Sequence, residues 1–327
     1  MPSRIASQHA RASSQTAGGA GEGGGGRRGW RLSWTSLIPA LLALAGMLVL
    51  VYPTAASWFS QYDQSRLIET RASEVADGDV SPSIAQQLAE AHEYNDLLSA
   101  GALLGADANV PTGAGTSEGG QLDYDSLLAD PTGVMARLRI PAIDVDLPIY
   151  HGTSDATLLK GVGHLEGTSL PVGGEGTHSV LTGHRGLASA TLFTNLDKVK
   201  EGDTFTIEVL DQVLTYQVIR TRVVDPSDTA SLRAAAGEDL VTLVTCTPLG
   251  INSQRILVTG ERITPTPQED LDAAGSVPDI PGFPWWAAAL AAGVVLVGVF
   301  VWRAGYPRTP RRAGRAAARP GGVDAPE

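Results

Sequence analysis

The sequence predicts a mainly β domain, built as a closed or nearly closed barrel, with a helical region before it and a transmembrane helix on either side. The first observation is a series of seven or eight short β-branched and apolar runs after residue 134, separated by turn residues, which is typical of a barrel. The second is a pair of uncharged stretches near the two ends of the chain, each long enough to cross a bilayer.

The first uncharged stretch predicts a transmembrane helix over residues 35–58, after a glycine-rich tail at 1–34 that we expect to be disordered. Trp34 and Trp58 bracket this stretch as interfacial residues do. A cleaved signal peptide is the alternative. The stretch is long for the apolar region of a signal peptide, however, and no Ala-x-Ala site follows it before the next helix.

The second uncharged stretch predicts a transmembrane helix over residues 284–302, with Trp285 and Trp302 near its ends. Six arginines occupy the basic tail at 303–327, and three more lie shortly before the first span. By the positive-inside rule, both termini are cytoplasmic and the middle of the chain is extracellular, held at the cell membrane.

Four segments are expected in the extracellular part: a helical region at 59–104, a lid or loop segment at 105–130, the β-barrel at 131–265 and a linker at 266–283. Within the helical region, Ser81-Pro82 predicts a helix start, with serine as N-cap and proline in the first turn. The stretch after residue 104 is rich in glycine and has no periodicity, which indicates a loop.

The extracellular region is strongly acidic. Residues 60–282 carry 13 Lys and Arg against 32 Asp and Glu, a net charge of −19. Because such a region has no basic groove for a phosphate backbone, we expect no nucleic-acid partner. There is no Cys/His cluster with zinc spacing, no phosphate-cradling glycine motif and no EF-hand loop, so we expect no metal and no cofactor. The single cysteine rules out an internal disulfide.

That cysteine, Cys246, closes a β-branched run, and Arg255 opens another run after a turn that contains Pro248 and Gly250. This is the pattern of a strand, a turn and a second strand. If the two strands pair as a hairpin, the thiol and the guanidinium lie at the same end of the sheet, and a nearby cation favours the reactive thiolate. A buried structural cysteine is the alternative; the strand-end position and the arginine favour a nucleophile.

A nucleophilic cysteine needs a base, and His184 has the same placement, since it follows the predicted strand at 179–183. A Cys–His pair can exist as thiolate and imidazolium, and the same histidine then protonates the leaving amine. A turn histidine that binds nothing is the alternative. His151 and His164 are rival candidates, and we interpret both as structural loop residues.

These residues resemble the catalytic signatures of sortases. The resemblance rests on Thr182-Gly-His184, on Thr245-Cys-Thr-Pro248 and on Arg255. Longer stretches are similar to class C sortases, which polymerise pilin subunits on Gram-positive cell surfaces; they lie at residues 133–141, 146–153, 163–171, 181–187 and 246–252. The similarity covers about residues 60–305.

The resemblance implies an eight-stranded barrel with the active site at one rim. It implies Cys246 as nucleophile, His184 as general acid/base, and Arg255 as stabiliser of the substrate and the tetrahedral intermediate. The implied substrate is a pilin or surface-protein precursor with an LPxTG-like signal, cleaved between Thr and Gly through a thioester and joined to a lysine amine of the next pilin. No cofactor is implied, because a thioester conserves the energy of the broken amide.

Class C sortases commonly carry a lid with an Asp-Pro-aromatic motif over the cysteine. The corresponding segment here, at 103–111, contains Asp107 but no Pro-aromatic pair after it. We expect either a lid in which Asp107 approaches Arg255, or a passive glycine-rich linker.

Two other functions are open on the sequence. A sortase that anchors proteins to the cell-wall peptide would use the same catalytic residues, although the second span and the long N-terminal segment favour pilus assembly. A non-catalytic, membrane-tethered β-domain for adhesion or scaffolding would have an inert Cys246.

Overall fold

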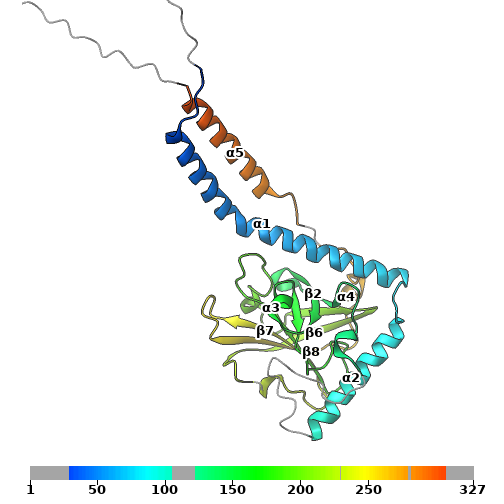
Figure 1. The fold of residues 1–327 in the computed structure, drawn as a ribbon. Coiled ribbons are helices and arrows are strands. Elements are labelled where there is room, and N and C mark those ends of the chain that lie inside the picture. Colours follow the sequence, from blue (N-terminus) through cyan, green and yellow to red (C-terminus); the bar gives the residue numbers. More distant parts are fainter. Residues whose placement is uncertain (1–28, 105–121, 229, 279–280, 307–327) are drawn as a thin grey trace, which may run out of the picture. The chain divides into compact units, whose positions relative to one another are not determined.

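The computed structural model describes residues 29–104, 122–228, 230–278 and 281–306 (Figure 1). The α-helices in these residues are α1 (Trp34–Asp77), α2 (Ile84–Leu104), α3 (Asp155–Leu158), α4 (Gln268–Asp272) and α5 (Trp285–Ala304). The strands are β1 (Val134–Ile140), β2 (Val145–His151), β3 (Val162–His164), β4 (Thr177–Thr182), β5 (Thr204–Val209), β6 (Gln212–Val224), β7 (Asp239–Thr247) and β8 (Gln254–Arg262).

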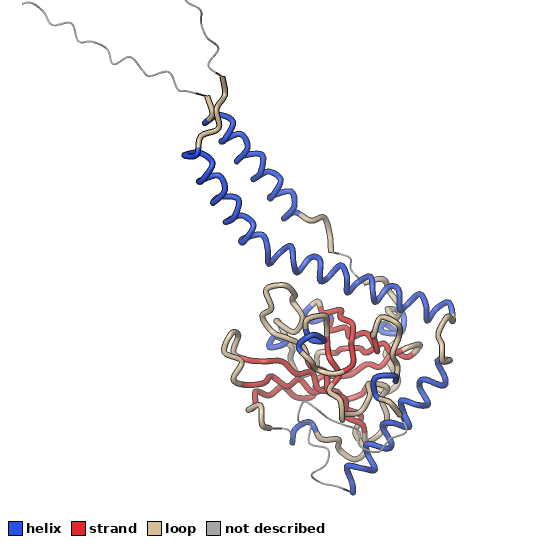
Figure 2. Tube along the Cα trace, viewed as in Figure 1, coloured by secondary structure: helices blue, strands red, loops and turns tan. Residues whose placement is uncertain are grey.

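The eight strands, red in Figure 2, close into a barrel in the order β1-β2-β3-β4-β7-β8-β6-β5. The pairs β2–β3 and β4–β7 are parallel, and the remaining neighbours are antiparallel. The predicted barrel is confirmed. Its eighth strand is the three-residue β3, which the alternation of apolar residues in the sequence does not predict.

The barrel interior is filled by large apolar side chains that are shielded from water. Phe205 on β5 and Tyr216 on β6 are fully buried, and their rings stack with centroids 5.5 Å apart. Gly260 on β8 passes directly against this stack, because a Cβ at that position would come within 2.5 Å of the Phe205 ring. Each such buried ring contributes on the order of 2 kcal/mol of apolar burial, and the strand needs glycine to reach it closely.

Helices α1 and α2 are attached to the barrel by buried side-chain amides. Asn95 of α2 pairs with the main chain of Leu170, accepting from its N–H at 2.7 Å and donating to its carbonyl at 3.1 Å. Gln64 of α1 donates to the carbonyl of Lys160 at 2.8 Å. Since buried amides require partners, these contacts set where each helix packs.

Helix α2 begins later than the sequence predicts. The expected N-cap is Ser81, but the helix starts at Ile84, and the hydroxyl of Ser83 accepts from the N–H of Gln86 at 3.3 Å. The carbonyl of Pro82 accepts instead from the side-chain amide of Gln87 at 2.7 Å. The cap moves because Ser83 satisfies a free N–H of the first turn while Gln87 satisfies the preceding carbonyl.

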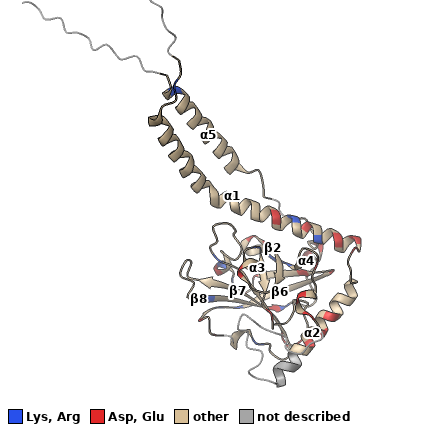
Figure 3. Ribbon diagram, viewed as in Figure 1, with Lys and Arg blue, Asp and Glu red and all other residues tan. Residues whose placement is uncertain are grey.

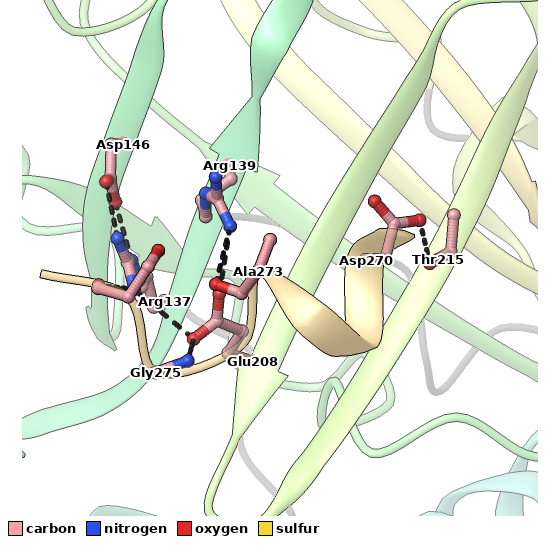
Figure 4. Close-up of polar contacts among 9 residues, drawn as sticks. Arg137, Arg139, Asp146, Glu208, Thr215, Asp270, Ala273 and Gly275 are labelled. Carbon is pink, nitrogen blue, oxygen red and sulfur yellow. Dashed lines mark hydrogen bonds and ion pairs between the residues drawn. The ribbon is translucent and has the colours of Figure 1, made fainter. Parts of the chain in front are cut away.

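The segment after β8 is tied to β1 by two arginines (Figure 4). Arg137, almost fully buried, makes two parallel bonds to Asp146 at 2.7 and 2.6 Å and donates to the carbonyl of Ser276 at 2.9 Å. Arg139 donates to the carbonyl of Ala273 at 3.1 Å. This part of the expected linker is therefore packed on the barrel through charge-assisted hydrogen bonds.

Two of the helices in the described residues are long and apolar enough to cross a membrane. Windows of 18 residues in α1 and α5 have mean hydropathies of 2.1 and 2.0. The charged residues of α1 lie in its C-terminal part (Figure 3), and Arg303, in the last turn, is the charged residue of α5. Length and composition suggest membrane association.

Aromatic residues lie at the ends of these apolar segments. The described residues divide into two compact units, one within 45–294 and the other formed by those before 45 and after 294. In the larger unit, Trp58 stacks on Tyr62 at 5.3 Å between ring centroids, and its indole donates to the carbonyl of Gly282 at 2.9 Å. In the smaller unit, the indole of Trp30 donates to the carbonyl of Trp302 at 3.1 Å. Tryptophans in such places are typical of membrane interfaces.

Candidate active site

The register of β7 and β8 places Cys246 directly opposite Arg255. Directly opposed residues of an antiparallel pair have side chains on the same face of the sheet. Two residues back, Val244 and Leu257 also oppose each other and form a small apolar cluster with Val180 of β4, separate from the barrel core. Because side chains alternate along a strand, the thiol and the guanidinium lie on this outer face of the barrel.

The parallel pairing of β4 with β7 brings His184 to the same rim. Thr182 pairs with Val244, and His184 and Cys246 each lie two residues beyond that pair. The pairing continues past the end of β4, since the N–H of Gly183 donates to the carbonyl of Val244 at 3.0 Å. The hydroxyl of Thr245 donates back to the carbonyl of Gly183 at 2.7 Å. The three candidate residues are thus brought together at the ends of three neighbouring strands.

Gly183 is required just before His184. A Cβ at this position would lie 2.6 Å from the ring of Phe193, which is fully buried. The N–H of Phe193 in turn donates to the carbonyl of His184 at 3.1 Å. The chain therefore turns tightly around this phenylalanine and leaves the imidazole half-buried at the rim.

Arg255 is half-buried and is oriented by its own turn. One guanidinium nitrogen donates to the carbonyls of Asn252 and Gln254, both at 3.0 Å. Within the described residues, no carboxylate forms an ion pair with it. In that part of the chain, the other two guanidinium nitrogens make no hydrogen bond, and their N–H groups can donate to a ligand beside Cys246.

A buried histidine, His178, fixes the loop before β7 on the outer face of the barrel. Its Nδ1–H donates to the carbonyl of Arg233 at 2.9 Å, and its Nε2 accepts from the hydroxyl of Thr242 at 2.7 Å. That hydroxyl lies 2.9 Å from the hydroxyl of Thr259. Burial lowers the pKa of His178, which keeps it neutral. This chain of bonds fastens the loop before β7 over the apolar cluster, where Leu232 packs.

The two rival histidines make structural hydrogen bonds, but they are the last residues of β2 and β3 and do not lie in loops as the sequence interpretation expects. His164 is fully buried; its Nδ1 accepts from the hydroxyl of Tyr124 at 2.9 Å and its Nε2 donates to the carbonyl of Ser169 at 2.9 Å. Burial lowers its pKa to about 4. His151 donates to the carbonyl of Leu127 at 2.7 Å, and burial lowers its pKa as well. Both rings are therefore engaged in hydrogen bonds with residues other than those of the candidate site.

Arg185 is a residue that the sequence interpretation does not assign. It contacts three segments: Thr194 through its carbonyl at 3.2 Å, Thr247 through its hydroxyl at 2.9 Å, and Asp197 through its carboxylate at 2.8 Å. The one sequence signal is its place directly after His184 in the motif. Local sequence patterns do not predict these contacts, because the three partners lie 9 to 62 residues away along the chain.

Asp107 lies outside the described residues. Among the residues that the structure describes, no group of three or more His, Cys, Asp or Glu side chains is arranged to hold a metal ion. The chemistry that the site offers is a thiol, an imidazole and a guanidinium on one rim, which suits nucleophilic acyl transfer.

The chain is similar to known proteins of one family. The Sortase domain model matches residues 138–263. Sortase C-1 from Actinomyces oris is 51% identical, with a TM-score of 0.50, over 55% of this chain and 99% of that structure. Sortase C1 from Streptococcus agalactiae is 42% identical, with a TM-score of 0.54, over 62% of this chain and 100% of that structure. The chain belongs to the sortase family.

Within that family, these structural neighbours are class C sortases. Among curated relatives, Sortase D of Bacillus subtilis is 32% identical over 130 residues, which is 39% of this chain. The chain spans 63% of the length of that relative, and 58% of the length of Sortase A of Listeria monocytogenes, to which it is 30% identical.

Proposed function

We propose that this sortase is a cysteine transpeptidase that cleaves an LPxTG-like sorting motif between Thr and Gly and joins the threonine to a lysine amine of a pilin. The observation that carries the proposal is the meeting of Cys246, Arg255 and His184 at the ends of β7, β8 and β4. A nucleophile, a cation and an acid/base group on one face are the parts that acyl transfer needs.

In the first half-reaction, the Cys246 thiolate attacks the threonine carbonyl carbon, and the carbonyl oxygen takes up the negative charge. The C–N bond to glycine then breaks, and protonated His184 gives its proton to the departing amine. The product is a thioester on Cys246. In the second half-reaction, a lysine amine attacks the thioester and loses a proton to His184. The isopeptide bond forms and the thiolate is released.

Arg255 acts on the charge that develops in both half-reactions. Its other N–H groups stabilise the oxyanion or hold the substrate carbonyls, and its bonds to Asn252 and Gln254 keep the fork in place. Because this orientation exists before the substrate arrives, little reorganisation is needed during the reaction.

Two features support pilus assembly over anchoring to the cell-wall peptide. The solved neighbours are C-type sortases, and one of them, 39% identical with a TM-score of 0.52, is described as sortase C1 of a Group B Streptococcus pilus island. The chain also has a second apolar helix, α5, after the barrel. With α1 and α5 as spans, the barrel is extracellular and both termini are cytoplasmic.

The test uses the full chain in detergent micelles or nanodiscs. Incubation with an LPxTG peptide should add the mass of the acyl fragment to the protein, and Cys246→Ala should add none. A peptide with a pilin-type lysine should then take over the acyl group faster than a cell-wall peptide amine. Faster transfer to the wall peptide would identify an anchoring sortase. A folded wild-type protein that forms no adduct and releases no product would be a non-catalytic β-domain.

A further inference from the structure

We propose that Arg185 is a positioning residue that holds His184 beside Cys246. This positioning role rests on the proposed function, because it takes His184 and Cys246 to act together in the same acyl transfer. Its basis is the geometry of the guanidinium, which joins the His184 loop to the residue that follows the nucleophile.

Arg185 connects three parts of the chain through one nearly buried side chain, 9% exposed. One nitrogen donates to the hydroxyl of Thr247, the neighbour of Cys246, at 2.9 Å. A second donates to the carbonyl of Thr194 at 3.2 Å, and a third lies 2.8 Å from the carboxylate of Asp197. Each of the three guanidinium nitrogens therefore has its own partner, an arrangement that a lysine ammonium cannot reproduce.

The backbone on both sides of His184 is tied to β7. On the N-terminal side, Gly183 exchanges two hydrogen bonds with Val244 and Thr245. On the C-terminal side, the Arg185–Thr247 bond makes the corresponding tie. Gly186 continues this contact, because the space where its Cβ would lie is taken by the side chain of Leu249 in the turn after Cys246.

His184 depends on these ties for its position. Nothing in the described part of the chain forms a hydrogen bond to its ring, whereas a catalytic base is commonly oriented by a third group. Its position is therefore set by the loop that carries it, and Arg185 supplies the hydrogen bond between the C-terminal side of this loop and the strand of the nucleophile. A misplacement of about 1 Å in such a pair can reduce the rate by roughly a hundredfold.

The competing explanation is that Arg185 only stabilises the fold, as any buried ion-paired arginine does. Arg137 offers the matched control, because its side chain is 6% exposed and is also bonded to a carboxylate and a main-chain carbonyl. Its hydrogen bonds go to Asp146, Glu208 and Ser276, so they join β1 to its neighbouring strands and to the segment after β8, away from the site residues.

The experiment measures the pH profile of Cys246 alkylation by iodoacetamide in the full chain, together with kcat and KM for an LPxTG peptide. Cys246 is the only cysteine, so alkylation reports on it alone. In the wild type, pairing with His184 should sustain alkylation at low pH, and His184→Ala should abolish this component. Arg185→Gln and Arg185→Lys should lose the same component and should lower kcat by roughly tenfold or more with little change in KM.

Thr247→Val tests the contact without removing a buried charge and should reproduce part of the effect. Combined with Arg185→Gln, it should add nothing further, because both changes break one link. Arg137→Gln should lower the melting temperature while leaving the alkylation profile unchanged. A wild-type profile and kcat in Arg185→Gln, with reduced stability alone, would overturn the positioning role.

Failure of the proposed function gives a different result. If the wild type does not process any sorting peptide but its low-pH alkylation still requires both His184 and Arg185, the positioning role stands and the reaction is misassigned. If wild-type alkylation at low pH is already that of His184→Ala, there is no Cys–His pair, and the positioning role is overturned with it.

Discussion

Cys246 on β7 lies directly opposite Arg255 on β8, and both side chains are on the outer face of the barrel. The guanidinium is held by the carbonyls of Asn252, in the turn between the two strands, and of Gln254, the first residue of β8. The strand pairing itself is made by main-chain hydrogen bonds. Either side chain can therefore be replaced while the β7–β8 ladder that places the other is kept.

Replacing Cys246 by alanine should abolish acyl-enzyme formation and peptide cleavage. The side chain is half-buried at a strand end, so the change should cost about 1 kcal/mol or less of unfolding free energy. Intact-mass analysis after incubation with an LPxTG peptide measures the first effect, and thermal unfolding measures the second. Residual cleavage by folded Cys246→Ala protein would show that Cys246 is not the nucleophile.

Replacing Arg255 by alanine should reduce kcat/KM by roughly a hundredfold or more, as loss of an oxyanion donor typically does. Arg255→Lys should also be poor, because an ammonium cannot hold the turn carbonyls and point further donors at the substrate. Steady-state kinetics on the sorting peptide provide the measurement. The exposed Arg222 of the neighbouring strand β6 is the matched control, and Arg222→Ala should stay close to wild type.

Replacing His184 by alanine should also reduce the rate by roughly a hundredfold or more, through loss of the acid/base group. Folded His151→Gln protein should keep most of its activity, because the His151 ring forms a structural hydrogen bond with the carbonyl of Leu127. Kinetics normalised to the folded fraction distinguish the two. Equal losses per folded molecule would show that the wrong histidine has been chosen.

Stability should decrease as the pH falls, because buried histidines are kept neutral. The pKa of His164 is about 4 in the folded protein, against about 6.5 in an unfolded chain. The unfolded state therefore binds more protons between these values, and stability present above pH 6.5 is lost progressively toward pH 4. For His164 alone, the full loss is on the order of 3 kcal/mol. The lowered pKa values of His151 and His178 act in the same direction.

Denaturant unfolding of the full chain at pH 7, 5.5 and 4.5 measures this dependence. His164→Gln should be less stable at pH 7, since it breaks the bonds to Tyr124 and Ser169, but its stability should change less with pH. An unchanged pH dependence in this variant would mean that other groups control acid unfolding.

Gly183→Ala should damage both folding and activity. The new methyl group would meet the buried Phe193 ring, and overpacking of this kind typically costs about 1–3 kcal/mol. The loop would shift at the residue before His184, so kcat should also fall in the folded fraction. Gly282→Ala is the control, because a Cβ there meets nothing within 4 Å and its backbone is not in the left-handed region. Similar kinetics for the two variants would contradict the tight-turn interpretation.

The strands around the catalytic hairpin were predictable because their signal is local. The sequence predicts strands at 240–246 and 255–263, and the structure has Asp239–Thr247 and Gln254–Arg262. Long β-branched runs bounded by turn residues define such elements within a residue or two. By contrast, β3 has three residues and exists through its bonds to β2 and β4, which no local pattern encodes.

By itself, the sequence determined the barrel class and the two apolar helices. It also determined that Cys246 and Arg255 lie at the same end of a hairpin, because a hairpin pairs residues that are close along the chain. The sequence pointed to His184 from its place after a predicted strand, and only the tertiary structure decided that this strand end lies at the same rim as Cys246. The parallel pairing of β4 with β7 joins segments that are distant in sequence, and Arg185 and Thr247 are 62 residues apart. Periodicity encodes the conformation and apolar face of each strand. The choice of its neighbours depends on how all eight strands together bury those faces and close the barrel.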